Sequence, residues 1–275
     1  MAEISAAAVK ALREKTDLPL MRVKAALTEA GGDEAKAMEI LKSQVKGLIE
    51  KRANNSALEG RIFVAVKPDQ TEAAMVEFAC ESAPVAGAPM FLALGEALVN
   101  QMLNGPGAKT GEELLEQTYN GVKLKDQFEE LVNKIGEKFV VARVAKFQGP
   151  VGYYIHHDGK TACVFQAEGP LKEDPVLRDV AMHIVGLKPI FATTAELDQK
   201  EIEAERARLT EEIKASGKPA NIIDKIVAGK LSVFFRDKGV LAEQAFAKDE
   251  AKSVQQVLEA AGFKPKAFTM WVLGN

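Results

Sequence analysis

Hydrophobic residues recur at helical spacing over the first fifty residues of the chain, in three separate runs. The first run ends at Lys15 and Thr16, the second follows Pro19, and the third follows Asp33. Proline is tolerated in the first turn of a helix and aspartate is a common N-cap, so both mark helix starts. The pattern predicts a three-helix module over residues 1–53, whose small core suits it to docking a partner rather than to chemistry.

Two β-rich stretches followed by a helical stretch occur twice in the rest of the chain. The first copy covers residues 61–66, 73–80 and 90–103, and the second covers residues 152–156, 161–167 and 175–187. The copies lie roughly ninety residues apart, a spacing typical of duplicated supersecondary units. We therefore predict an α+β fold with two similar core subdomains, each an antiparallel sheet with helices on one face. Their predicted bounds are residues 54–148 and 149–275, after a linker at residues 50–60.

Two further segments have patterns of their own. Residues 112–131 are rich in helix formers and lead into a strand-like stretch at residues 139–147. Residues 196–214 and 222–235 are helical and charged on most sides, with only a narrow apolar stripe. The stripe of the first helix consists of Ile202, Leu209 and Ile213.

A narrow stripe is typical of a projecting helical hairpin or coiled coil. We place this hairpin at about residues 193–236, before a C-terminal return segment at about residues 237–275. The alternative is a solvated helix that lies on its own domain.

Composition limits the classes of function. The 275 residues are 47% hydrophobic and 27% charged, with a net charge of -3, as in ordinary globular proteins. Without a general basic field, we expect no direct nucleic-acid binding. Cys80 and Cys163 have neither metal-type spacing nor a disulfide pattern, which indicates a reducing, cytoplasmic compartment. The start lacks a signal-peptide pattern and no window of eighteen apolar residues occurs, so we expect no membrane insertion.

Residues 12–27 contain, in order, a leucine-arginine pair, a threonine, a tight turn, a hydrophobic pair and a lysine. This window resembles the N-terminal signature of the bacterial translation elongation factor Ts family. The resemblance extends over about residues 4–273, through further matches at residues 135–145, 217–219, 226–230 and 240–258. Pro19 replaces the small residue usual in the family's turn, and Ala245 stands where the family prefers proline.

The resemblance implies a guanine-nucleotide exchange factor rather than an enzyme. Such a factor binds elongation factor Tu with GDP, perturbs the Mg²⁺ and phosphate site, and promotes GDP release so that GTP can bind. It has no cofactor or metal of its own. The residues that match the family's Tu contacts are Leu20, Met21, Lys24 and His156. The helical hairpin would mediate contacts away from the core and is also a candidate for self-association.

The family's magnesium-dislocating loop aligns with Ser82, Ala83, Pro84 and Val85. Family members have Thr-Asp-Phe-Val here, so this chain lacks both the acidic and the aromatic side chain. Because an aromatic anchor often dominates such contacts, we expect either weaker exchange or a co-adapted partner. The N-terminal tip would then carry a larger share of partner binding.

An enzymatic alternative rests on the histidines and cysteines. Adjacent residues of a strand point to opposite faces, so His156 and His157 are expected to diverge rather than chelate a metal. His183 lies in a dense apolar helix, which favours a core role. No phosphate-binding glycine motif is present. The remaining alternatives are a small-molecule cleft in which His156 or Cys80 acts, and a paralogue that binds Tu without exchanging its nucleotide.

Overall fold

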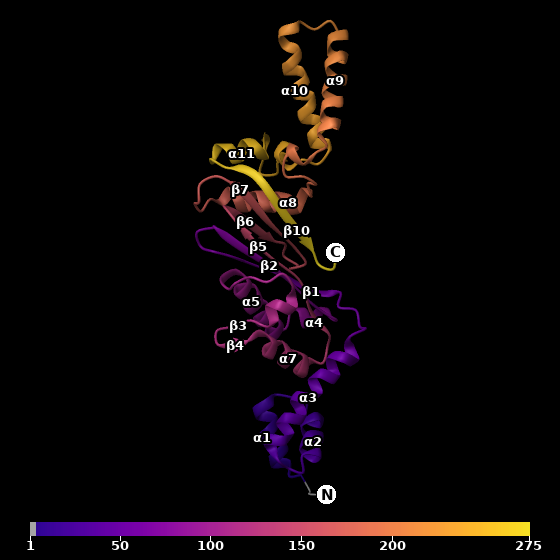
Figure 1. Cartoon of the computed structure of the whole chain (residues 1–275), viewed down its shortest axis with the longest axis vertical. Coiled ribbons are helices and arrows are strands. Elements are labelled where there is room, and N and C mark those ends of the chain that lie inside the picture. The colour runs from indigo at the N-terminus through magenta and orange to yellow at the C-terminus, as the bar shows by residue number, and fades with distance from the viewer. Residues whose placement is uncertain (1–3) are drawn as a thin grey trace. The chain divides into compact units, whose positions relative to one another are not determined.

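Figure 1 shows the computed structural model, which describes residues 4–275. These residues form two compact units. The first unit combines residues 4–63 with residues 76–145 and 274. The second combines residues 64–75, 146–273 and 275. Helices and small sheets occur in both units, which confirms the predicted α+β class.

Three helices form the start of the first unit: α1 (Ala6–Thr16), α2 (Leu20–Glu29) and α3 (Glu34–Arg52). The hydroxyl of Ser5 caps α1, and the carboxylate of Asp33 accepts the Lys36 N–H at 3.1 Å to cap α3. The helices share one apolar core, made of Val9, Leu12, Leu18, Val23, Ala26, Leu27, Ala37 and Leu41. The predicted linker is shorter than expected, because α3 continues to Arg52 and the next strand begins at Glu59.

The two main sheets have the same strand order, which supports the duplication predicted from the spacing. The strands β1 (Glu59–Val66), β2 (Glu72–Cys80) and β5 (Phe139–Gln148) form one sheet in the order β1-β2-β5. The strands β6 (Val151–Ile155), β7 (Thr161–Glu168) and β10 (Lys264–Val272) form the other in the order β6-β7-β10, with antiparallel pairing. In each sheet the second hairpin strand is central, and a strand from much later in the chain pairs with its free edge.

The helices between the first hairpin and β5 are α4 (Ala83–Ala86), α5 (Pro89–Asn104), α6 (Gly111–Leu115) and α7 (Leu124–Ile135). The helix-rich stretch at residues 112–131 contains α6 and most of α7, and the hairpin of β3 (Thr118–Tyr119) and β4 (Val122–Lys123) separates them. Its turn residues Asn120 and Gly121 have φ values of 50° and 81°. Asn-Gly is the preferred pair for such a turn, so the sequence contained a signal for this hairpin.

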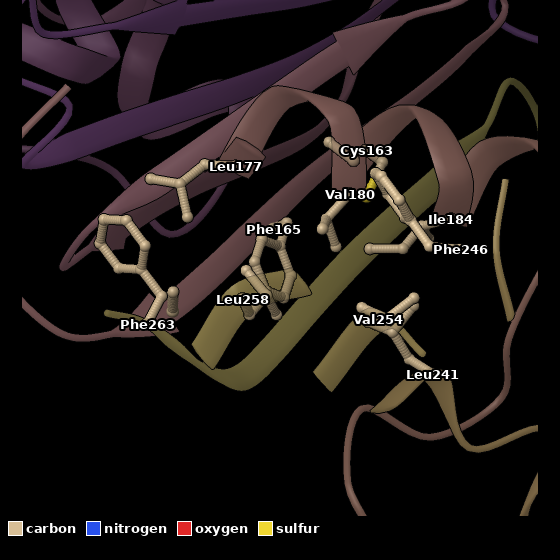
Figure 2. Close-up of a cluster of buried hydrophobic side chains, with 12 residues drawn as sticks. Cys163, Phe165, Leu177, Val180, Ile184, Leu241, Phe246, Val254, Leu258 and Phe263 are labelled. Atoms are coloured by element: carbon tan, nitrogen blue, oxygen red, sulfur yellow. The ribbon is translucent and has the colours of Figure 1, made fainter. Parts of the chain in front are cut away.

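The second unit packs helices α8 (Pro175–Leu187) and α11 (Val254–Ala260) with its sheet. Side chains from the sheet, both helices and the C-terminal return segment meet in one core, which Figure 2 shows. The fully buried ring of Phe165 comes from the central strand of the sheet. A small hairpin of β8 (Ala245–Phe246) and β9 (Asp249–Ser253) completes the return segment and buries Phe246 in the same core.

The charged helices α9 (Gln199–Ala215) and α10 (Ala220–Asp237) lie side by side as the predicted hairpin (Figure 1). Leu209 and Ile213 of α9 pack against Val227 and Leu231 of α10 in a small core of their own. Ile202 instead joins a separate cluster at the base of the hairpin, with Leu197, Val240 and Ala242. Two of the three stripe residues therefore pair the helices with each other, and the third packs at the base.

Candidate partner-binding site

The turn between α1 and α2 directs two apolar side chains to solvent. Asp17, at φ 55°, ends α1 by donating its N–H to the Arg13 carbonyl at 2.7 Å. Leu18 then enters the core of the three helices. Pro19 is the N-cap of α2, and its φ of -54° suits a helix start. The side chains that follow, Leu20 and Met21, are 51% and 71% exposed.

Lys24 completes what we call the docking tip, namely Leu20, Met21 and Lys24. It is exposed and lies four residues after Leu20, so the two share one face of α2. Exposed apolar side chains beside a cation suit a partner surface that has an apolar recess and an anionic edge. The unbranched thioether of Met21 can adapt its shape to such a recess.

Residues 82–86, called the exchange turn below, form a helical turn in the stretch that aligns with the family's magnesium-dislocating loop. Ser82 is the N-cap of the single helical turn α4, and Pro84 lies in its first turn, where a fixed φ favours helix. At the other end, Arg61 Nε donates to the Ala86 carbonyl at 2.9 Å. Ala83 and Pro84 are exposed and Val85 is partly exposed. The turn is thus a short helical element whose middle residues lie at the surface.

Cys80 lies directly before this turn but is unsuited to nucleophilic chemistry. Its side chain is buried, and its Sγ donates to the Ser82 carbonyl at 3.3 Å. Burial, together with the nearby charge of Glu137, raises the pKa of this thiol to about 11. Burial also raises the pKa of the Cys163 thiol. Both groups therefore stay protonated at neutral pH, whereas a reactive cysteine needs its thiolate.

His156 belongs to the second unit, where the expectation of diverging imidazoles is wrong. The strand β6 ends at Ile155, so both histidines lie in the following turn and strand alternation does not apply to them. Their ring centroids are 4.2 Å apart. The His156 backbone closes the turn, since its N–H donates to the Thr161 carbonyl and its carbonyl accepts from Gly159. The ring stays partly exposed beside Tyr154.

His183 is the core histidine that its apolar helix indicated. It is 2% exposed. Its Nε2 lies 2.9 Å from Gln244 Oε1, and its Nδ1 accepts the Ala247 N–H at 3.1 Å. Burial lowers the pKa of this imidazole. Both ring nitrogens are thus occupied by structural hydrogen bonds.

The cavities do not coincide with the groups of the enzymatic alternative. One of about 460 Å³ lies among α1, α3 and α7, and another of about 260 Å³ lies under the end of α3. Neither is lined by His156 or Cys80. Within residues 4–275, no group of three or more His, Cys, Asp or Glu side chains could hold a metal ion. In the same described part, no helix has the length and apolar character needed to cross a membrane.

Comparison with known proteins supports the resemblance found in the sequence. A family model described as "Elongation factor TS" matches residues 84–275. Elongation factor Ts of Thiobacillus denitrificans is 38% identical over 277 aligned positions, which cover 100% of this chain and 93% of that protein. The protein of the same name from Paenarthrobacter aurescens is 37% identical, with 100% of each chain covered. That from Aquifex aeolicus is also 37% identical, with 97% of each covered.

Proposed function

The chain belongs to the elongation factor Ts family and is a translation elongation factor, and on this basis we propose that it exchanges the guanine nucleotide of elongation factor Tu. In this proposal it binds Tu with GDP, disturbs the Mg²⁺ and phosphate site, and leaves Tu ready for GTP. Mg²⁺ bridges phosphate oxygens and protein ligands, so a small shift of those ligands weakens nucleotide binding. By linkage, a factor that prefers nucleotide-free Tu must lower the nucleotide's affinity by the same ratio.

The observation that carries this proposal is the docking tip. The three-helix module buries most of its large apolar side chains but exposes Leu20 and Met21 at a helix start. Large apolar side chains left in solvent beside a cation favour a protein partner over a small molecule. We propose that these residues and Lys24 bind Tu, and that His156 makes a second contact from the other unit.

The exchange turn is proposed as the element that disturbs the Mg²⁺ site. Its exposed residues Ala83 and Pro84 carry no charge and no aromatic ring, so they would act by steric displacement. Weaker exchange than in family members with Asp-Phe, or a compensating change in Tu, is the expected consequence. The chain would need no cofactor, because nucleotide and Mg²⁺ both belong to the partner. Its place of action would be the cytoplasm.

Two alternatives remain to be separated from this function. A small-molecule enzyme using Cys80 is disfavoured, because the thiol is buried and its raised pKa keeps it protonated. A paralogue that binds Tu without exchange would use the same docking tip but would leave GDP release unchanged.

Stopped-flow release of a fluorescent GDP analogue from the cognate Tu tests the proposal. We expect micromolar concentrations of the chain to accelerate release well above the spontaneous rate. Met21→Asp should raise the concentration needed for half-maximal acceleration, because a charge replaces an apolar contact. Tight binding with unchanged release would identify the non-exchanging paralogue, and neither binding nor acceleration would refute the proposal. Ala83→Asp/Pro84→Phe then shows whether the family residues increase the maximal rate in this chain.

A further inference from the structure

The exchange turn depends on a carboxylate outside it. Glu137, just before β5, accepts the Ser82 backbone N–H at 3.1 Å through Oε2 and the Ser82 hydroxyl at 2.6 Å through Oε1. The Ser82 side chain makes no capping bond to α4. A single helical turn has little stability alone, because nucleation costs more than one hydrogen bond returns. The conformation of the turn therefore rests on Glu137 at one end and Arg61 at the other.

A second carboxylate ties the same place to the end of the three-helix module. Glu81 accepts from Arg52 Nη1 at 3.0 and 3.2 Å, and Arg52 is the last residue of α3. It also accepts from Asn55 Nδ2 at 2.8 Å and from the Lys138 N–H at 2.6 Å. Partial burial opposes ionisation of Glu81, but these hydrogen bonds outweigh it and hold the pKa below its usual value.

Lys138 closes the arrangement from the other side. Its ammonium donates to the carbonyl of Ala53 at 2.6 Å and to that of Asn55 at 2.8 Å. Two adjacent residues thus bind different segments. Glu137 binds the exchange turn, and Lys138 binds the linker that follows α3. Glu81 joins these two attachments, since it bonds to α3, to the linker and to the Lys138 backbone.

We propose that Glu81 and Glu137 are positioning residues of nucleotide exchange, which preform the exchange turn and fix it to the end of α3. This rests on the proposed function. Once the docking tip binds, a turn held in this way would meet the Mg²⁺ site without a separate ordering step. Because the docking tip supplies the first contact, a misplaced exchange turn should lower the rate in the bound complex more than the binding of Tu, and small misplacements of a positioned group cost large factors in rate.

The test compares Glu137→Gln with the full chain in stopped-flow GDP release over a range of factor concentrations. The amide is uncharged and has one acceptor oxygen, so both charge-assisted bonds to Ser82 are lost and only weaker neutral ones can replace them. We expect the maximal rate to fall about tenfold, with a half-saturating concentration that changes less than about twofold. Ser82→Ala should lower the rate similarly, and the double variant should lose little more, because both changes remove one interaction. Glu81→Gln should give a smaller effect of the same type.

Glu116→Gln serves as the matched control. Glu116 pairs with Lys123 and Lys125 in the same unit and does not bond to the exchange turn. The maximal rate of GDP release with Glu116→Gln should therefore equal that with the unaltered chain. Hydrogen exchange of the free chain provides a readout that needs no Tu. In Glu137→Gln, the amide hydrogens of residues 81–87 should exchange faster, while the hydrogen exchange of β2 and α2 stays unchanged.

The outcomes separate the two proposals. If the unaltered chain releases GDP from Tu and Glu137→Gln retains its maximal rate, the positioning role is wrong. Faster hydrogen exchange throughout β2 would show general loosening and would also overturn it. If the unaltered chain fails to release GDP, the proposed function fails. Unchanged hydrogen exchange at residues 81–87 in Glu137→Gln would independently refute the positioning role of Glu137.

Discussion

At the scale of single residues, burial decides which reactive side chains are available. Cys80 and His183 are chemically the most versatile groups in their segments, yet both are buried and engaged in hydrogen bonds within the fold. By contrast, Leu20 and Met21 have no reactive chemistry but are exposed. This distribution favours a binding protein, in which apolar contacts matter more than acid-base groups.

His183 should make folding sensitive to mild acid. Its Nδ1 accepts the Ala247 N–H, so the folded state requires the neutral ring, and burial lowers its pKa. In the unfolded chain His183 takes up a proton near the usual histidine pKa of about 6.5, and in the folded chain it does so only at lower pH. This contribution to stability is therefore full above that pH and is lost as the pH falls further towards the lowered pKa.

We expect the melting temperature to fall between pH 7.5 and 5.5 by more in the unaltered chain than in His183→Asn, which keeps an acceptor for Ala247. Differential scanning fluorimetry at several pH values measures this. His157→Asn, which alters an exposed ring, should behave like the unaltered chain. Parallel curves for all three proteins would show that His183 does not contribute.

At the scale of elements, close backbone approach explains a glycine in β6. A Cβ at Gly152 would lie 2.1 Å from the Leu177 carbonyl carbon, at the start of α8. Backbone atoms cannot move aside as a side chain can, so the helix would have to shift. The duplicated hairpin-and-helix unit therefore packs closely here because this strand position lacks a side chain.

Gly152→Ala should destabilise the second unit by about 1–3 kcal/mol, the range for overpacking a close contact. Chemical denaturation followed by circular dichroism measures the free energy of unfolding. Gly186→Ala is the control, because a Cβ there meets no atom within 4 Å and alanine favours helix. Equal stability of the two variants would disprove the steric explanation.

The helical hairpin illustrates how an element uses its apolar surface. Leu209, Ile213, Val227 and Leu231 pack together within one chain, which leaves a charged exterior that includes Glu205, Arg208 and Glu212. Self-association through this hairpin stays a prediction, and it would have to use residues outside the stripe. Val233 of α10, which is 44% exposed, is the apolar residue best placed for it.

At the scale of the whole molecule, a few polar contacts join the three-helix module to the rest of the first unit. Arg22 of α2 donates to the Asn133 carbonyl at 2.7 Å and to Asn133 Oδ1 at 2.6 Å, both from α7. The Nζ of Lys134, also from α7, lies 3.7 Å from the Oδ2 of Asp17. The docking tip is thus attached through the linker, through the pair of Arg52 with Glu81 at the end of α3, and through this contact.

Arg22→Ala should free the module without unfolding it. Hydrogen bonds from a charged group contribute about 1.5–3 kcal/mol each, so their loss leaves the linker at residues 53–58 held by Glu81 and Lys138 but open more of the time. Limited proteolysis should then cut this linker several times faster, with little change in the far-ultraviolet circular dichroism. Arg13→Ala, on the exposed side of α1, should be cut at the rate of the unaltered chain. Equal rates for both variants would contradict the contact.

The sequence by itself predicted the elements whose signals are local. Apolar periodicity, caps and turn residues located the three helices, both hairpins with their helices, and the stripe of α9, because each depends on residues only a few positions apart. Family resemblance, rather than physical reasoning from the residues, selected Leu20, Met21, Lys24 and His156. Their contacts with Tu stay predictions.

Only the tertiary structure decided features that join distant segments. The strand β10 pairs with β7, whose residues are about a hundred positions earlier, and no local pattern identified that edge. Likewise, Glu137 shapes the exchange turn from 55 positions away, and Glu81 joins it to Arg52. A short turn has too few internal hydrogen bonds to specify its own conformation, so its shape depends on partners that only folding brings to it.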